Sequence, residues 1–275
     1  MVYVRRHYEK DSISDIDRTL AIEGVISRKN IDLIERYIKL GGTFILTSGR
    51  SVSYTKLIAK QIKGVRYIVC TNGSIIYDLE KEKVLYANKI EYEHLKKLYE
   101  ICSINDFKFI ITSTSKDLVN KDALINQTIF TSLDKTLYDN IDATQVVIYG
   151  PDKEKILDIE KIISEMKDLS VINKSRALYD NNFINNKNYW LDIVPLGSNK
   201  GDGVLKMCKY LNVPLKDTVR VGDDLNDLPM FFDEGLNVCV DNAMFELKQK
   251  AGFITKSCAE DGIAYLLENI IEEKL

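Results

Sequence analysis

Short apolar runs alternate with amphipathic stretches along most of the chain. The runs are rich in β-branched and aromatic residues and lie at 43–47, 67–70, 218–221 and 236–240. Before the first run, apolar residues recur three or four positions apart, which predicts a helix with Ser27 as its N-cap and a stop at Gly41. This alternation of strands and helices predicts a parallel sheet with helices on both faces.

The middle of the chain follows a different pattern. Two apolar runs, 75–77 and 84–86, flank a polar stretch, which predicts a hairpin. Further on we expect helices at 91–104 and 152–167 and strands at 107–112, 145–149 and 189–193. Together these elements predict an α/β module over residues 80–193, inserted between the two halves of a core, 1–79 and 194–275.

The segment before Asp15 is too polar for the central strand that this pattern requires. It reads Tyr8-Glu9-Lys10-Asp11-Ser12-Ile13-Ser14, and only Ile13 suits a strand that is buried on both faces. We therefore expect either a short first strand or an irregular segment that joins the sheet late.

Composition removes several classes of function. The 38 basic and 41 acidic residues leave a net charge of −3, so no bulk field attracts nucleic acid or an anionic membrane. No apolar run approaches the roughly 18 residues that span a bilayer, and the first residues lack the apolar core of a signal peptide. We expect a cytoplasmic protein with neither nucleic-acid nor membrane partners. The five cysteines are scattered and are expected to be structural thiols.

Polar residues cluster where the predicted strands end. Asp15 and Asp17 follow the first candidate strand, and neighbouring carboxylates of this kind hold a hard cation or divide into nucleophile and proton donor. The run Gly222-Asp223-Asp224-Leu225-Asn226-Asp227 follows an apolar strand, where parallel sheets form ligand sites. A turn or a helix cap explains one or two of these acids, but it explains the whole run poorly.

Two further clusters contain candidate phosphate ligands. Thr47-Ser48-Gly49-Arg50 lies between a strand and a helix, where a hydroxyl group and backbone amides bind phosphate and an arginine adds a bidentate contact. Ser198-Asn199-Lys200-Gly201 opens a helix with a lysine, a charge that the helix dipole disfavours at that end. Taken alone, Lys200 is also compatible with an ordinary surface position.

The order of these four clusters resembles the haloacid dehalogenase superfamily, and more narrowly its Cof-type branch of sugar-phosphatase-like hydrolases with a class IIB cap. Cys70-Thr71-Asn72-Gly73-Ser74 is similar to the segment that leads into that cap. The resemblance covers nearly the whole chain. It implies an α/β fold, with a Rossmann-like doubly wound parallel sheet as the core and the inserted module as the cap domain.

The resemblance also implies a reaction. Asp15 would attack phosphorus, and Asp17 would protonate the leaving oxygen and then activate water. Mg²⁺ would be the cofactor, held by Asp15, Asp17 through its backbone carbonyl, and Asp223, with Asp227 in support. The residues expected to bind the phosphoryl group or substrate are Ser48, Gly49, Arg50, Lys200 and Asn226.

Two positions depart from the family pattern. Arg18 stands where the branch usually has glycine, which adds a bulky cation beside the nucleophile and constrains the backbone. Asp241 stands where a small residue is usual and adds a further acid. Neither change removes a catalytic group.

The leading hypothesis is a phosphatase that acts on small phosphorylated metabolites as a monomer or weak homodimer. One alternative is a non-catalytic phosphate-binding or interaction protein on the same fold, and another is a phosphomutase. The sequence does not identify the substrate.

Overall fold

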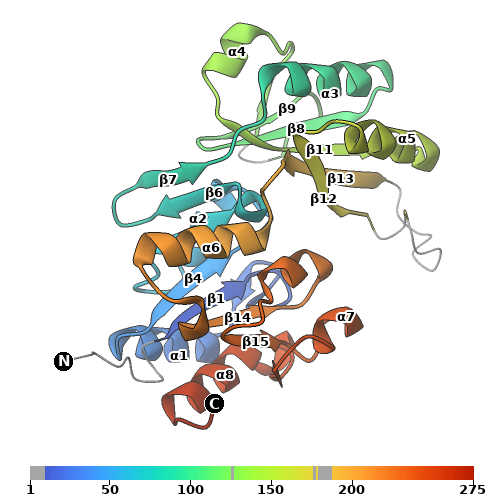
Figure 1. The fold of residues 1–275 in the computed structure, drawn as a ribbon. Coiled ribbons are helices and arrows are strands. Elements are labelled where there is room, and N and C mark those ends of the chain that lie inside the picture. The colour runs from blue at the N-terminus through green and yellow to red at the C-terminus, as the bar shows by residue number, and fades with distance from the viewer. Residues whose placement is uncertain (1–9, 125–126, 176–177, 179–187) are drawn as a thin grey trace. The chain divides into compact units, whose positions relative to one another are not determined.

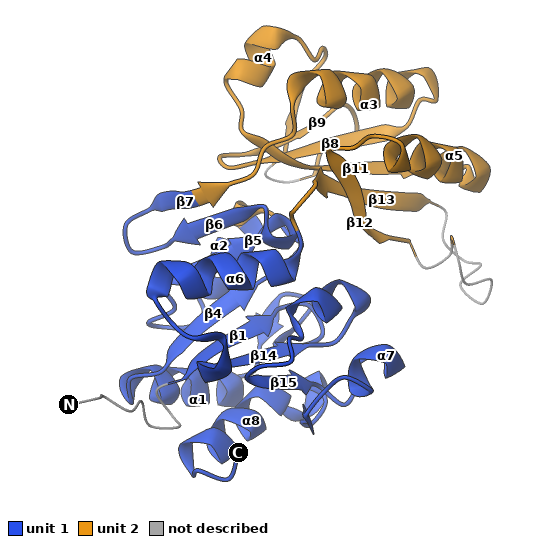
Figure 2. Ribbon diagram, viewed as in Figure 1, with its two compact units in different colours: residues 1–50, 54–85, 199–275 blue, residues 51–53, 86–198 orange. Residues whose placement is uncertain are grey.

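The computed structural model describes residues 10–124, 127–175, 178 and 188–275 and divides into two compact units (Figure 1). Unit 1 comprises residues 1–50, 54–85 and 199–275, and unit 2 comprises residues 51–53 and 86–198 (Figure 2). The sequence placed the corresponding boundaries at 79/80 and 193/194. Residues 179–187 form a polar stretch of the sequence in which we expect a loop before the strand at 189–193, and they lie outside the described residues.

Unit 1 is built on a mainly parallel sheet. Among the described residues its strand order is β16-β15-β14-β1-β4-β5-β6-β7, with β6 antiparallel to β5 and each pair from β16 to β5 parallel. The strands are β1 (Asp11–Asp15), β4 (Thr43–Thr47), β5 (Tyr67–Cys70), β6 (Ile75–Asp78), β7 (Lys83–Ala87), β14 (Thr218–Gly222), β15 (Leu236–Cys239) and β16 (Phe253–Ile254). A separate ribbon pairs β2 (Ala21–Ile22) with β3 (Val25–Ile26). The predicted parallel α/β fold is confirmed.

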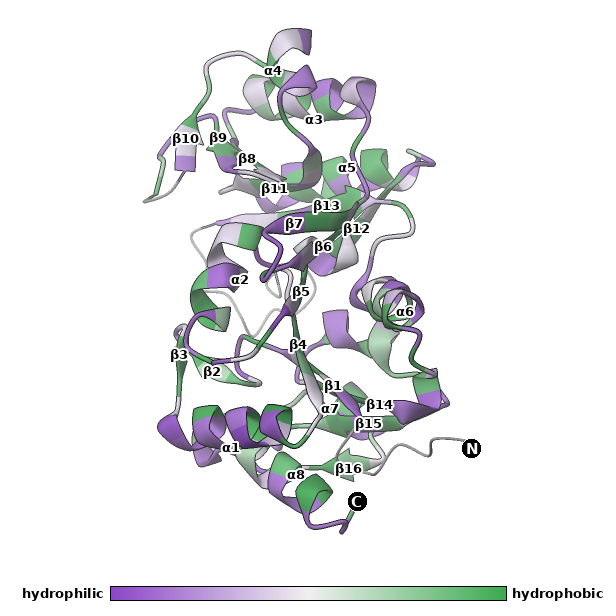
Figure 3. Cartoon of the chain, turned by 90° about the vertical axis from the view of Figure 1, so that its left-hand side faces the viewer, coloured by the Kyte–Doolittle hydropathy of each residue, from purple (hydrophilic) through white to green (hydrophobic). Residues whose placement is uncertain are grey.

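Helices cover both faces of this sheet. Helices α2 and α6 lie on opposite sides of strands β4 and β5 (Figure 3), and α1 packs against α8. The α-helices are α1 (Arg28–Lys39), α2 (Val52–Ala59), α6 (Lys200–Leu211), α7 (Phe245–Lys248) and α8 (Gly262–Ile271). Short 3-10 turns are η2 (Thr71–Gly73), η4 (Leu215–Asp217), η5 (Leu225–Met230) and η6 (Cys258–Glu260). Ser27 caps α1 as predicted, because its hydroxyl accepts a hydrogen bond from the Asn30 amide at 3.1 Å.

Strand β1 is central and buried although its sequence is polar. It lies between β4 and β14, and each of its five residues is buried. The Ser12 hydroxyl donates to the Tyr37 hydroxyl at 3.2 Å, and the Ser14 hydroxyl donates to the Asp15 carbonyl at 2.8 Å. The serines therefore satisfy their polar atoms inside the protein, which removes most of the cost of burying them.

Unit 2 is a mainly antiparallel sheet with helices on one face. The strand order is β10-β9-β8-β11-β13-β12 over the described part of the unit, and β9 and β10 form the parallel pair. The strands are β8 (Lys108–Ser113), β9 (Asp117–Val119), β10 (Gln127–Ile129), β11 (Ala143–Gly150), β12 (Leu169–Lys174) and β13 (Tyr189–Pro195); the helices are α3 (Tyr92–Ile104), α4 (Lys135–Asp139) and α5 (Lys153–Ser164). Helices α3 and α5 contribute Leu95, Leu98, Ile156 and Ile159 to the core of the unit.

No helix in the part of the chain that the structure describes is both long enough and apolar enough to cross a membrane. The five cysteines are free and buried, and burial raises the pKa of each thiol to about 11 or 12. Protonated, buried thiols of this kind are inert, as expected for structural cysteines.

Candidate active site

The site forms where β1 and β14 end at the same edge of the unit 1 sheet. The two strands are parallel, and Ser14 pairs with Val221, so Asp15 and Asp223 emerge close together from opposite ends of the sequence. Gly222 has no side chain at a point where a Cβ atom would lie 2.5 Å from the Asp227 carboxylate. The absence of a side chain there lets Asp227 approach the strand end.

Three buried carboxylates meet at this edge and form what we call the carboxylate cluster: Asp15, Asp223 and Asp227. One oxygen from each lies within 4.8 Å of the others. The second Asp227 oxygen, Oδ2, accepts hydrogen bonds from the backbone amides of Asp223 and Asp224, at 2.8 and 3.1 Å. Thr19 Oγ1 donates to Asp223 Oδ1 at 3.1 Å. Backbone and side-chain donors therefore fix the orientation of two of the three acids.

Lys200, at the start of α6, provides a buried cation for the cluster. Its Nζ lies 2.5 Å from Asp15 Oδ1 and 2.5 Å from Asp227 Oδ1, and its side chain is 1% exposed. Helix α6 reaches this depth because Gly201 has no side chain where a Cβ atom would lie 2.1 Å from the Pro229 carbonyl oxygen. Lys200, which the sequence left open as either a functional residue or an ordinary surface residue, is thus part of the buried site.

The cluster carries more negative charge than Lys200 offsets. Burial raises the pKa of Asp15 well above its ordinary 3.8, and Asp227 and Asp223 raise it further, while Lys200 opposes them. Burial, with Asp227 and Asp224, likewise raises the pKa of Asp223 to about 7. Burial lowers the pKa of Lys200, but Asp15 and Asp227 outweigh it, so the net shift is upward.

The donor set fits a hard divalent cation. Three carboxylate oxygens within reach of one another, in a site with excess negative charge, are the ligands that Mg²⁺ selects. A divalent cation would lower the pKa of Asp15 and of Asp223 and so favour their ionised forms, because a nearby positive charge stabilises the charged form of a carboxyl group.

The Asp17 side chain lies in different surroundings from Asp15. Strand β1 ends at Asp15, and the amides of Leu20 and Ala21 both donate to the Ile16 carbonyl, so the alternation of an extended segment ends here. Arg50 Nε donates to Asp17 Oδ2 at 3.1 Å, and the Tyr54 hydroxyl donates to Asp17 Oδ1 at 3.4 Å. Arg50, predicted as a phosphate ligand, is therefore paired with a carboxylate in this structure.

Ser48, Gly49 and Asn226 converge on Asn72. Ser48 is buried, its hydroxyl accepts from the Arg50 amide at 3.1 Å, and its carbonyl accepts from the Asn72 amide at 3.1 Å. Asn226 Nδ2 donates to Asn72 Oδ1 at 3.2 Å, and a Cβ atom on Gly49 would lie 3.0 Å from the Asn72 amide group. Glycine at position 49 thus allows this close approach.

Sequence reasoning missed three residues at this site: Asn72, Tyr54 and Thr19, whose hydroxyl donates to Asp223 Oδ1. Asn72 is fully buried in a left-handed conformation with φ of 50°, and the Asn-Gly pair that contains it was a detectable signal for such a turn. Tyr54 contacts Asp17 from α2, and nothing in the sequence distinguished it from the other tyrosines.

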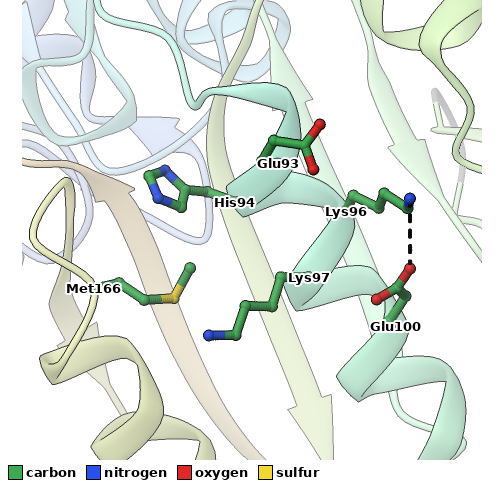
Figure 4. A pocket seen from close by; sticks show the side chains of 6 residues that line it. All are labelled: Glu93, His94, Lys96, Lys97, Glu100 and Met166. Atoms are coloured by element: carbon green, nitrogen blue, oxygen red, sulfur yellow. Dashed lines mark ion pairs between the residues drawn. The ribbon is translucent and has the colours of Figure 1, made fainter.

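Unit 2 contains a hollow of about 390 Å³ with different chemistry (Figure 4). Its lining residues are Glu93, His94, Lys96, Lys97, Glu100 and Met166. Lys96 and Glu100 form an ion pair at 4.0 Å one helical turn apart, as on an ordinary solvated helix face. The hollow shares no residue with the carboxylate cluster.

Comparison with known proteins gives a family match over most of the chain. The model of the haloacid dehalogenase-like hydrolase family matches residues 12–267. The 5-amino-6-(5-phospho-D-ribitylamino)uracil phosphatase YcsE of Bacillus subtilis (strain 168) is 23% identical over 258 residues, which cover 91% of each chain.

Solved structures of the family have the same fold. A haloacid dehalogenase-like hydrolase from Bacteroides thetaiotaomicron superposes with a TM-score of 0.81 at 22% identity, covering 95% of this chain and 99% of that one. The sugar phosphatase BT4131, of subclass IIB, superposes with a TM-score of 0.74 at 17% identity, covering 94% and 98%. The family match over most of the chain, together with this shared fold, shows that the protein belongs to the haloacid dehalogenase-like hydrolases.

Proposed function

We propose that this protein is a Mg²⁺-dependent phosphatase that hydrolyses small phosphorylated metabolites through an aspartyl-phosphate intermediate, an acyl phosphate formed on Asp15. The family assignment makes the chain a hydrolase, and relatives that it matches are named as phosphatases. The observation that carries the proposal is the contact of Asp15 with Lys200 inside the carboxylate cluster, with Asp17 held separately by Arg50.

The two aspartates have surroundings suited to different tasks. Asp15 is buried, and Lys200 fixes its Oδ1, which leaves Oδ2 as the candidate nucleophile toward phosphorus. The side chain of Asp17 is 38% exposed, so it can exchange protons with water and with a leaving group. In the first step Asp15 forms the bond to phosphorus, and the departing ester oxygen takes a proton from Asp17.

In the second step Asp17 takes a proton from water as the water oxygen attacks the same phosphorus. The bond between phosphorus and Asp15 breaks, so inorganic phosphate leaves and both aspartates return to their starting state. Lys200 holds positive charge beside the reacting group throughout. Mg²⁺ on Asp15, Asp223 and Asp227 would supply the remaining positive charge that keeps Asp15 ionised and offsets the charge of the phosphate.

Ser48 and Asn226 remain candidate contacts for the phosphoryl group. Ser48 is on the strand end next to Asp15, since Asp15 pairs with Thr47 in the register of β1 and β4. Asn226 is held by Asn72. Both can donate hydrogen bonds to phosphate oxygens, and Gly49 leaves the space that their arrangement needs.

The test is phosphate release from a panel of phosphorylated metabolites and a chromogenic phosphomonoester, with Mg²⁺ and with EDTA. The panel should include sugar phosphates and the phosphoribitylaminouracil named for YcsE. We expect metal-dependent turnover that falls at least about 1,000-fold in Asp15→Asn. Asp32→Asn is the matched control, because Asp32 pairs with Arg28 on the surface of α1.

The outcomes separate the competing functions. No turnover of any substrate by folded protein that still binds Mg²⁺ would favour a non-catalytic phosphate-binding role. Conversion of a sugar phosphate to its isomer, without release of phosphate, would instead identify a phosphomutase.

A further inference from the structure

Arg18 occupies a strained position beside the carboxylate cluster. Its φ of 64° is in the left-handed region, where any residue with a Cβ atom is disfavoured relative to glycine. The Arg18 amide donates to the Ala21 carbonyl at 2.8 Å, and Asn242 Nδ2 donates to the Arg18 carbonyl at 2.9 Å. Asn242 Oδ1 in turn accepts from the Cys258 amide at 2.7 Å. The backbone at Arg18 is therefore fixed from both sides, and its side chain projects from a defined point.

The Arg18 side chain reaches the one cluster acid that Lys200 does not contact. Arg18 Nε lies 3.8 Å from Asp223 Oδ2, whereas Lys200 Nζ contacts Asp15 and Asp227. The other Asp223 oxygen accepts from Thr19, so Oδ2 is the oxygen that faces the arginine. Asp223 is 4% exposed and Arg18 is 59% exposed, which places a solvated cation at the rim of a buried carboxyl group.

We propose that Arg18 competes electrostatically with the divalent cation for Asp223 and so weakens metal binding at the carboxylate cluster. This inference rests on the proposed function, because it concerns the cation of the same site. Arg18 and a bound cation carry charge of the same sign, so they repel each other, and both are attracted to the Asp223 carboxylate. Removing the arginine charge should therefore tighten metal binding without supplying any new ligand.

The expected effect is moderate because Arg18 is largely in water. A single charge and a divalent ion about 6 Å apart in a solvent-like dielectric repel by an amount equivalent to roughly tenfold in affinity, before screening. Physiological salt, with a screening length of about 8 Å, reduces this to roughly threefold. We thus expect metal affinity to rise about threefold to tenfold when the charge is removed.

The test is calorimetric titration of Mg²⁺ into the native protein and into Arg18→Gln, Arg18→Lys and Arg18→Gly, at low and high ionic strength. Arg18→Gln removes the charge and keeps a long side chain, Arg18→Lys keeps the charge, and Arg18→Gly removes both the charge and the strain. Glu23→Gly is the matched backbone control, because Glu23 is exposed and has a φ of 51°. Far-UV circular dichroism checks that each variant is folded.

We expect Arg18→Gln and Arg18→Gly to bind Mg²⁺ about threefold to tenfold more tightly, with the gain shrinking as salt is added. Arg18→Lys and Glu23→Gly should stay within about twofold of the native protein. Equal affinity of the native protein and Arg18→Gln would overturn the inference. Tighter Mg²⁺ binding in Arg18→Gly but not in Arg18→Gln would also overturn the inference, since the effect would then come from the backbone.

Failure of the proposed function has a different signature. Asp223→Asn should bind Mg²⁺ at least about tenfold more weakly than the native protein, because it loses a charged ligand. If the native protein binds no Mg²⁺, or if Asp223→Asn binds it as well as the native protein does, the carboxylate cluster is not the Mg²⁺ site. The inference about Arg18 would then be wrong as well. Phosphate release measured on the same samples reports the proposed activity separately.

Discussion

Without metal, the protein should lose stability as pH rises through neutrality, and Asp223 should account for much of the loss. Burial and the neighbouring acids Asp227 and Asp224 raise the pKa of Asp223 from 3.8 to about 7. Between those pH values the folded protein holds a proton that the unfolded chain has released. The stabilisation from this proton is complete below pH 3.8 and disappears as pH rises through about 7.

The magnitude follows from the size of the pKa shift. The rise in the pKa of Asp223 from 3.8 to about 7 corresponds to a loss of about 4 kcal/mol of unfolding free energy as pH rises from below the first value to above the second. About 2 kcal/mol of this is lost between about pH 5.5 and about pH 8.5, where most other carboxyl groups remain ionised. The pKa of Asp15 is also raised, mainly by burial, so Asp15 contributes a loss of the same sign.

Urea unfolding at several pH values, in EDTA, measures the effect. The free energy of unfolding of the native protein should fall toward alkaline pH. In Asp223→Asn the fall between about pH 5.5 and about pH 8.5 should be smaller by about 2 kcal/mol. Mg²⁺ should restore stability most at alkaline pH, because it binds the ionised carboxylates. Asp32→Asn, on the surface of α1, should keep the native slope. Identical slopes for the native protein and Asp223→Asn would refute the reasoning.

Three further predictions test other parts of unit 1. Lys200→Met leaves the buried carboxylates without their cation, so turnover should fall at least about 100-fold and the free energy of unfolding should fall by about 3 kcal/mol. Near-native turnover in saturating Mg²⁺ would contradict a role for Lys200 in holding positive charge beside the reacting group. Gly235→Ala should cost about 2 kcal/mol or more in urea unfolding, because φ is 77° and the new Cβ would lie 2.5 Å from Arg220 Nη1 and 2.6 Å from the Leu215 carbonyl oxygen. A cost below about 0.5 kcal/mol would contradict this, because it would mean that the backbone around Gly235 shifts easily. Arg50→Met releases Asp17 and should lower kcat about tenfold while KM changes less than about threefold; the reverse pattern would mean that Arg50 binds substrate.

The sequence predicted the parts of the fold in which local pattern and tertiary environment agree. The strand at 43–47, the Ser27 cap and the start of α6 all follow from apolar spacing and capping chemistry. Strand β1 did not follow from them, because the Tyr37 hydroxyl that satisfies Ser12 comes from a helix whose position the sequence does not specify. Hydrophobicity alone treats Ser12 as unfavourable in a core, whereas a hydrogen-bonded serine is tolerated there.

The candidate site was predictable as a set of residues but not as a set of contacts. The resemblance to the family implied that Asp15 and Asp223 hold the same cation, and the parallel pairing of β1 with β14 brings the two residues to one edge of the sheet. The partner of Arg50 was not predictable, because a guanidinium group binds a carboxylate and a phosphate with the same geometry. The folded arrangement places Asp17 Oδ2 3.1 Å from Arg50 Nε.

The polar composition of β1 also bears on how the chain is made. In the fold, β1 pairs with β4 on one edge and with β14 on the other, and β14 begins at Thr218, after the whole of unit 2, so the second edge of β1 has no partner strand in a nascent chain that has not reached β14. An apolar strand with an open edge for that long would be a template for aggregation in the nascent chain. Ser12 and Ser14 lower the apolar content of β1, so a chain in which β14 has not yet joined the sheet should be less prone to aggregate than one with an apolar strand at this position.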